Sequence, residues 1–152
     1  MELERVLQAE GVAYEKTSHT TAFTAQEIAA QEHVSGDEVA KPVIVRADDR
    51  YVLCVLPASH KIDMGQLACV LEAERCDLAT EPEIAHLFPD VEVGAEPPMG
   101  NLYNLPTVVD SRLAERETIT FAAGTHREAI RMRYEDYERL ARPTVADFAT
   151  HL

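Results

Sequence analysis

Three places in the sequence hold residue types that could act on a bound ligand. Lys41 precedes Pro42 inside an otherwise apolar, β-branched run. His126 follows Gly124 in a second apolar region, and the stretch 93–110 between them is rich in proline and glycine. A lysine supplies a positive charge, a histidine a donor or an acceptor, and an irregular loop free main-chain N–H groups. We take these three places as the candidate site.

The stretch 93–110 is too rich in proline and glycine for a helix or a ladder strand, and too apolar for a solvated linker. Gly94 and Gly100 allow a positive φ or a close approach of a ligand to the main chain. Free N–H groups are expected at Ala95, Glu96, Met99 and Asn101. We interpret the loop as the floor of a binding site, although an ordered connector without a ligand also fits these residues.

Lys41 and His126 each have a simpler explanation as well. Pro42 implies a sheet edge or a bulge, which sets Lys41 beside a break in the ladder, but an edge lysine can also lie along apolar surface without any function. If residues 125–133 form a strand, His126 shares a face with Ile130 and Met132. A buried histidine bonded to a backbone carbonyl fits this pattern too.

Other catalytic chemistries lack their sequence patterns. We find no H-E-x-x-H motif, no His/Cys cluster at ligand spacing, no G-x-S-x-G elbow and no phosphate-binding G-x-x-x-x-G-K-[ST]. Cys54 lies within an apolar strand, which is typical of an inert core thiol, and the adjacent Ser59 and His60 have poor geometry for a nucleophile–base pair. We therefore expect neither a metal nor a cofactor.

Composition limits the class of protein and its partners. A chain of 152 residues suits one domain, and none of its apolar runs is long enough to span a bilayer. The net charge of −13 argues against broad nucleic-acid binding, so any contact with RNA must be local. The three cysteines show no C-x-x-C spacing, which favours a reducing compartment, and we expect the cytoplasm.

Periodicity and capping residues predict an α+β or mixed α/β fold. The pairs Thr24/Glu27 and Thr80/Glu83 form Thr-x-x-Glu capping boxes, and Asp63 is a third candidate cap. Helices are expected over 2–10, 24–33, 63–71, 80–88 and 134–141. Strands are expected over 12–17, 39–46, 51–56, 75–79, 107–109, 118–123 and 125–133, with 39–46 and 51–56 forming a hairpin.

The chain resembles the YbaK/EbsC family, which is related to the editing insertion of prolyl-tRNA synthetase. Five segments carry the resemblance, in order and over nearly the whole chain. They are T-A-F-T-A-Q-E-I-A-A (21–30), A-K-P-V-I-V (40–45), V-L-P-A-S-H-K-I-D (55–63), V-G-A-E-P-P-M-G-N-L (93–102) and F-A-A-G-T-H-R-E-A-I (121–130). The family's G-x-x-x-P loop matches Gly94 to Pro98, its lysine matches Lys41, and its Gly-Thr-His segment matches 124–126.

The resemblance implies a single editing domain over residues 1–152, with a central mixed, barrel-like sheet and flanking helices. It implies an aminoacyl-tRNA hydrolase that acts in trans on a mischarged small amino acid, alanine or cysteine, on tRNA for proline. Two alternatives stay open: a module that binds a nucleotide, a tRNA or a synthetase without catalysis, and a hydrolase of another small ester.

The resemblance also implies the site residues. Lys41 is expected to hold the terminal phosphate or adenosine end, the loop N–H groups the ester carbonyl, and His126 the aminoacyl group. Since main-chain groups act in this scheme, we expect truncation of the Glu96 side chain to matter little. The catalytic set is Lys41, Gly94, Ala95, Glu96, Pro98 and Gly100, and the substrate-binding set is Thr21, His60, Lys61, Gly124, Thr125, His126, Ile130 and Met132.

The expected partner is the acceptor end of a mischarged tRNA, with prolyl-tRNA synthetase as a second candidate. We expect no membrane and no DNA partner. The sequence leaves open whether the protein is a monomer or a weak dimer.

Overall fold

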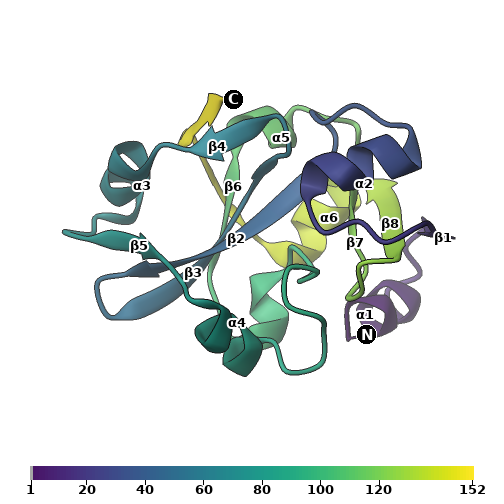
Figure 1. Cartoon of the computed structure of the whole chain (residues 1–152), viewed down its shortest axis with the longest axis horizontal. Helices are drawn as coiled ribbons and strands as arrows, with labels where there is room; N and C mark the ends of the chain where they lie inside the picture. The colour runs from purple at the N-terminus through teal and green to yellow at the C-terminus, as the bar shows by residue number, and fades with distance from the viewer. Residues whose placement is uncertain (1) are drawn as a thin grey trace.

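The computed structural model describes residues 2–152 and contains a five-stranded mixed sheet. In spatial order its strands are β5 (Cys76–Leu78), β2 (Ala40–Ala47), β3 (Arg50–Pro57), β6 (Thr107–Asp110) and β9 (Thr144–Ala146). The β2–β3 hairpin is antiparallel, whereas β6 joins β3, and β9 joins β6, in parallel. The hairpin runs diagonally through the molecule, with other helices and strands on both sides of it (Figure 1).

Two smaller sheets complete the strand arrangement. One has the order β1 (Tyr14–Ser18), β8 (Glu128–Arg133) and β7 (Thr118–Ala122), and the other pairs β4 (His60–Ile62) with β10 (Ala149–His151). A single parallel bridge between Val39 and Thr120 links the three-stranded sheet to the start of β2. The two larger sheets therefore meet where β2 begins.

The helices are short, and three of them begin at predicted caps. They are α1 (Glu2–Ala9), α2 (Ala25–Glu32), α3 (Met64–Leu71), α4 (Glu81–Leu87), the 3₁₀ turn η1 (Gly100–Tyr103), α5 (Ser111–Ala114) and α6 (Tyr134–Ala141). Thr24, Asp63 and Thr80 each accept an N–H from the first turn of the following helix, which satisfies donors that a helix start leaves free.

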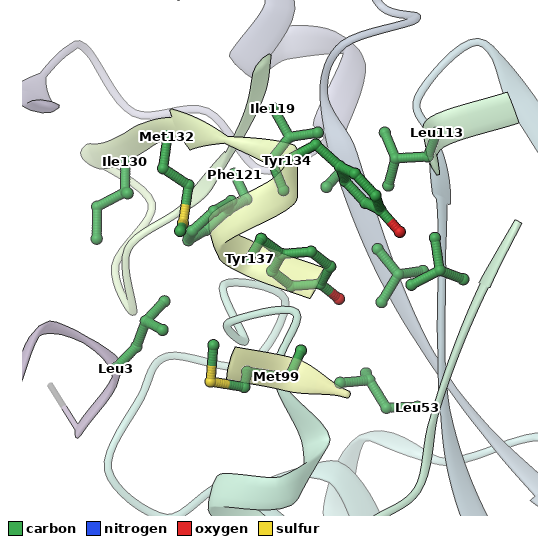
Figure 2. Close-up of a cluster of buried hydrophobic side chains, with 14 of the residues drawn as sticks. Leu3, Leu53, Met99, Leu113, Ile119, Phe121, Ile130, Met132, Tyr134 and Tyr137 are labelled. Carbon is green, nitrogen blue, oxygen red and sulfur yellow. The ribbon is translucent and has the colours of Figure 1, made fainter. Parts of the chain in front are cut away.

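The largest hydrophobic core lies between the five-stranded sheet, the three-stranded sheet and α6. Tyr137 of α6 is fully buried there, beside Met99 from the Pro/Gly loop and Leu53 from β3 (Figure 2). A second cluster around Cys54 and Leu67 fills the space between β2, β3 and α3. The Pro/Gly loop is thus packed into the core rather than lying free over it.

Pro42 lies on a part of β2 that is paired on one side only. Its partner across the hairpin is Val55, whereas β5 covers β2 only from Val45 to Ala47. The Ile44 carbonyl accepts the Ala79 N–H on the outer side, so Pro42, two residues earlier, directs its missing donor to the same outer side. Within residues 2–152 no strand pairs with β2 on that side of Pro42, so the missing N–H costs no ladder hydrogen bond. This confirms the predicted edge.

The predicted α+β class with a central mixed sheet is confirmed. The barrel expected from the resemblance is not closed within residues 2–152, because the strands separate into three sheets. Residues 60–62, which lie in none of the predicted helices or strands, form β4 through a long-range pairing with β10 that local periodicity does not reveal. The strand expected over 125–133 begins only at Glu128. Within residues 2–152, no helix has the length and apolar character to cross a bilayer.

A buried carboxylate joins the end of β6 to the segment before β10. Asp110 has no exposed surface, and its Oδ2 accepts the N–H groups of Phe148 and Ala149 at 3.0 and 2.8 Å. Its Oδ1 accepts the main-chain N–H of Arg112 at 3.0 Å, and the Arg112 guanidinium lies 3.2 Å away. Hydrogen bonds to a charged group are stronger than neutral ones, so this carboxylate is a main attachment of β10.

We expect Asp110→Ala to lower the free energy of unfolding by about 2–5 kcal/mol, because it leaves the buried N–H groups of Phe148 and Ala149 unpaired, each at a typical cost of about 1–3 kcal/mol. Urea unfolding at pH 7 measures the change. Asp49→Ala, at an exposed turn between β2 and β3, is the matched control and is expected to stay within about 0.5 kcal/mol. A loss at Asp110 no larger than that of the control would contradict the assigned attachment.

Candidate functional site

Two glycine-containing segments are hydrogen-bonded to each other. The Glu92 N–H donates to the Gly124 carbonyl at 2.9 Å, and the Gly124 N–H donates to the Ala95 carbonyl at 3.1 Å. The Glu92 carboxylate also accepts the His126 N–H at 2.8 Å. Gly94 and Gly124 have φ values of 93° and 87°, a region that side-chain-bearing residues rarely adopt. The loop around Gly94 and the turn around Gly124 therefore form one hydrogen-bonded unit.

The His126 ring lies between this loop and an exposed phenylalanine. Its Nε2 is 2.9 Å from the Val93 carbonyl oxygen, and since a carbonyl only accepts, Nε2 carries the proton. The ring centroid lies 4.9 Å from that of Phe23. A Cβ at Gly94 would come within 3.1 Å of His126 Cε1. The ring thus lies close against Gly94, so a side chain at this position would press on the ring in addition to straining the backbone.

A cavity of about 260 Å³ opens beside Gly94 at the unpaired edge of β2. The start of α2, the edge of β2, the loop and the end of β7 each contribute part of its wall. Its lining residues are Phe23, Thr24, Ala25, Ile28, Ala40, Lys41, Pro42, Val43, Gly94 and Ala122. The structure therefore brings the predicted Lys41 and Gly94 into one cavity, with His126 in contact with its wall.

Lys41 is half-buried at the edge of the cavity. Its Nζ donates a hydrogen bond of 2.6 Å to the His60 carbonyl. Burial lowers the pKa of the Lys41 ammonium, because removing a cation from water disfavours its charged form. The side chain is held by the fold rather than extended into solvent, unlike a simple surface lysine.

Glu96 shapes the loop from within. It is 2% exposed, and its Oε1 accepts the Gly94 N–H at 3.0 Å. Burial raises the pKa of the Glu96 carboxyl, and the hydrogen bonds from Gly94 and its own N–H, with the nearby His126, offset part of that rise. Glu96 therefore has a buried contact within the loop that the sequence analysis did not foresee when it expected this side chain to matter little.

Part of the main chain expected to form the cradle is already hydrogen-bonded within the loop. The Gly94 N–H is taken by Glu96, and the Ala95 N–H donates to the Glu92 carbonyl at 2.9 Å. Neither N–H is free for a substrate carbonyl in this conformation. Lys41 is then the group at the cavity best suited to stabilise negative charge.

Pro98 and Gly100, both predicted as catalytic, have packing roles. The Pro98 carbonyl accepts the buried Tyr137 hydroxyl. A Cβ at Gly100 would lie 2.6 Å from the Leu105 carbonyl oxygen and 2.7 Å from Thr107 Oγ1. The close approach that Gly100 permits is therefore to the chain itself, not to a ligand.

Ile130 and Met132 do not reach the cavity. Their exposures are 0% and 3%, and Figure 2 shows both in the hydrophobic cluster with Phe121. The prediction that they share a face with His126 is wrong because His126 lies in the turn before β8, where strand alternation has not begun. Their places are those of core residues.

The remaining predicted residues are spread around the site. Thr21 is exposed on the loop before α2, and Thr125 Oγ1 accepts the Arg127 N–H at 3.3 Å within the turn. His60 lines a separate polar hollow with Arg112, and only its carbonyl reaches Lys41. Lys61 lines a larger groove on the other side of Lys41.

Sequence reasoning missed Phe23 and Ile28. Phe23 is 67% exposed, and it stands at the position just before the Thr24 cap. An apolar residue there often packs against its own helix, which makes its contact with His126 hard to foresee. Its signal was an aromatic residue in a polar turn, T-T-A-F-T, with no predicted strand or helix to bury it.

Solved structures share this fold over nearly the full chain. A hypothetical protein aligns with a TM-score of 0.88 at 22% identity, covering 99% of this chain and 100% of its own. A candidate trans-editing enzyme for prolyl-tRNA synthetase aligns with a TM-score of 0.82 at 22% identity, covering 97% and 94%.

Sequence comparisons identify the family. The chain is similar to the multifunctional Ser/Thr-tRNA deacylase ProXp-y of Escherichia coli strain K12, with 27% identity over 148 residues, 94% of this chain and 88% of that protein. It is also 32% identical over 85 residues to the proline–tRNA ligase of Bacillus subtilis strain 168, covering 56% of this chain and 14% of the ligase. The aminoacyl-tRNA editing domain matches residues 19–140. The chain therefore belongs to the aminoacyl-tRNA editing domain family, as the resemblance in its sequence predicts.

Proposed function

We propose that this protein, as a single domain, hydrolyses the ester between a small, wrongly attached amino acid and the 3′ end of a tRNA, acting in trans. The observation that carries the proposal is the cavity at the open edge of β2, where Lys41, Gly94 and the His126 contact meet. Membership of the editing family supports the class of reaction.

The cavity suits a hydrolysis in which water is the nucleophile. Thr24 supplies the one side-chain hydroxyl among its lining residues, and that oxygen already accepts the Glu27 N–H at 3.1 Å as a helix cap. An aminoacyl ester is already activated, so a positioned water, assisted by the neighbouring ribose hydroxyl, is sufficient. In this scheme the Lys41 ammonium stabilises the charge that develops on the carbonyl oxygen or the adjacent phosphate.

The loop around Gly94 and the turn around Gly124 determine the shape of the cavity. Glu96 holds Gly94, and the Gly94 backbone leaves room for the His126 ring, which in turn meets Phe23. This arrangement fixes the width of the cavity at the end where the amino-acid side chain would lie.

Seryl and threonyl esters are our first candidate substrates, because the relative that spans nearly the whole chain is a Ser/Thr-tRNA deacylase. Alanyl- and cysteinyl-tRNA for proline, the substrates expected from the sequence, form the second set, and the partial match to a proline–tRNA ligase supports that relation. The net charge of −13 favours contact with the acceptor end alone, in the cytoplasm where charged tRNA is used.

The test is a deacylation panel with tRNA charged with serine, threonine, alanine, cysteine or proline. We expect hydrolysis of at least one small mischarged amino acid, with a correctly charged tRNA for proline spared. Turnover of small esters but of no charged tRNA would favour the alternative hydrolase, and binding of tRNA without turnover would favour a non-catalytic module.

Lys41→Met keeps the apolar stem of the side chain and removes its charge. We expect kcat/KM for the best charged tRNA to fall by about 10²–10³, the typical loss for an oxyanion-stabilising group. The free energy of unfolding should change by only about 1 kcal/mol, since one hydrogen bond to the His60 carbonyl is lost. Arg46→Met, an exposed cation on the same strand, is the control. Equal rates in both variants would remove Lys41 from the mechanism.

Glu96→Gln and Glu96→Ala separate the hydrogen bond to Gly94 from the charge. Glutamine keeps an acceptor for the Gly94 N–H, so its kcat/KM should stay within about threefold of wild type, whereas alanine should lose at least about tenfold through misplacement of the loop. Equal activity in the two variants would show that the Gly94 contact does not matter for turnover.

The same pair predicts a pH dependence of stability. Burial raises the pKa of Glu96 above its usual value of 4.5, so the stability that it contributes is present below 4.5 and is lost as pH rises through the folded-state pKa. Glu96→Gln has no such titration. Urea unfolding at pH 4 and pH 7 should show the glutamine variant gaining stability relative to wild type as pH rises, and a relative loss would contradict the raised pKa.

A further inference from the structure

A second and larger cavity adjoins the candidate site. It is a groove of about 520 Å³, twice the volume of the cavity beside Gly94. Its lining residues are Lys41, Val43, Leu56, Lys61, Ile62, Met64, Cys76, Asp77 and Leu78. Lys41 and Val43 line both spaces, so the groove and the cavity meet at Lys41.

The walls of the groove are mainly apolar and come from distant parts of the chain. Val43 and Leu56 belong to the β2–β3 hairpin, Ile62 to β4 and Met64 to α3. Leu78 of β5 stands at the rim and is 64% exposed, one of the largest exposures of an apolar side chain in residues 2–152. An exposed apolar side chain beside an apolar groove is typical of a surface that binds a flat or apolar group.

The charges at the groove favour an anion, although the chain as a whole is acidic. Lys41 lies at one end, and Lys61 is exposed on β4. Asp77 is the acidic residue of the lining, and its carboxylate is 2.8 Å from Arg75 Nε, which compensates its charge. The groove thus combines apolar walls with two uncompensated cations in a protein of net charge −13.

We propose that this groove binds the 3′-terminal nucleoside of the tRNA and its 5′-phosphate. The base lies against Leu78, Ile62 and Met64, Lys61 contacts the phosphate, and the ester reaches the smaller cavity past Lys41. This inference rests on the proposed function and names the subsite that would hold the nucleic-acid half of the substrate.

The two adjoining cavities match the two halves of an aminoacyl ester. The amino acid and the ribose are joined through one bond, so the spaces that hold them must be neighbours with the reacting carbonyl at their junction, where Lys41 stands. Packing of a base against apolar side chains is tolerant of sequence, and a terminal nucleoside common to all tRNAs requires no more.

Leu78→Asp tests the apolar wall, and Lys61→Glu tests the phosphate contact. Both side chains are exposed, so neither change threatens folding. With the charged tRNA that proves the best substrate, each variant should raise KM by about tenfold, which corresponds to a loss of about 1.4 kcal/mol of binding, and should leave kcat within about twofold.

Val145→Asp is the matched control, because Val145 is an exposed apolar residue of a different edge strand, β9, at 42% exposure. It should leave KM unaltered. AMP is the binding probe: in a ¹H–¹⁵N titration it should shift the amide signals of Val43, Ile62 and Leu78, and Leu78→Asp should weaken this binding about tenfold.

The outcomes separate the two proposals. Unaltered KM in both groove variants, or AMP shifts centred on the hollow around His60 and Arg112, would overturn the groove assignment even if charged tRNA is hydrolysed. If no charged tRNA is hydrolysed, yet AMP shifts the amide signals of the groove residues and Leu78→Asp weakens AMP binding, the proposed function is wrong and the nucleotide site remains.

Discussion

The site depends on a length of β2 whose outer edge is left without a strand partner. Pro42 brings this about, because it has no N–H to offer on that side, and β5 covers only Val45 to Ala47. Behind the gap, β2 is fully paired with β3, so the edge is open but rigid. Lys41 is therefore presented by a strand that is paired with β3 over its whole length, which suits a residue that must hold a charge in a fixed position.

The acidic composition serves the fold as well as the surface. Two buried carboxylates, Asp110 and Glu96, act as acceptors for main-chain N–H groups that would otherwise be unpaired. One holds the segment before β10 to the five-stranded sheet, and the other holds Gly94. The exposed carboxylate of Glu92 also accepts the His126 N–H and so joins the loop to the turn around Gly124. The loop around the cavity is thus ordered by acidic side chains as well as by main-chain hydrogen bonds.

Local signals in the sequence were enough for the elements and for part of the site. The caps at Thr24, Asp63 and Thr80 act on residues three positions away, so the sequence alone reveals them. Pro42 likewise marks its own edge. Gly94 and His126 were found, but the reason for their proximity, the hydrogen bonds between 92–95 and 124–126, joins segments about 30 residues apart. No local pattern encodes that pairing.

The errors have a common physical origin. Gly100, Ile130 and Met132 were placed in the site by residue type and alternation, yet tertiary packing determines what each one faces. The β4–β10 pair and the separation into three sheets depend on contacts between distant segments in the same way. Side-chain burial such as that of Glu96 is invisible in a loop where every neighbour is a proline, a glycine or a small residue.

The contact between Gly94 and His126 limits the order in which this site can change during evolution. Gly94 is held by two independent conditions, a φ of 93° and a distance of 3.1 Å from its would-be Cβ to the His126 ring. Replacing His126 by a smaller residue removes the second condition and leaves the first. A lineage can therefore vary the histidine while the glycine stays fixed, but it cannot begin with the glycine. Diversification of the amino acid accepted would accordingly proceed through position 126 and its neighbour Phe23, on an unchanged loop.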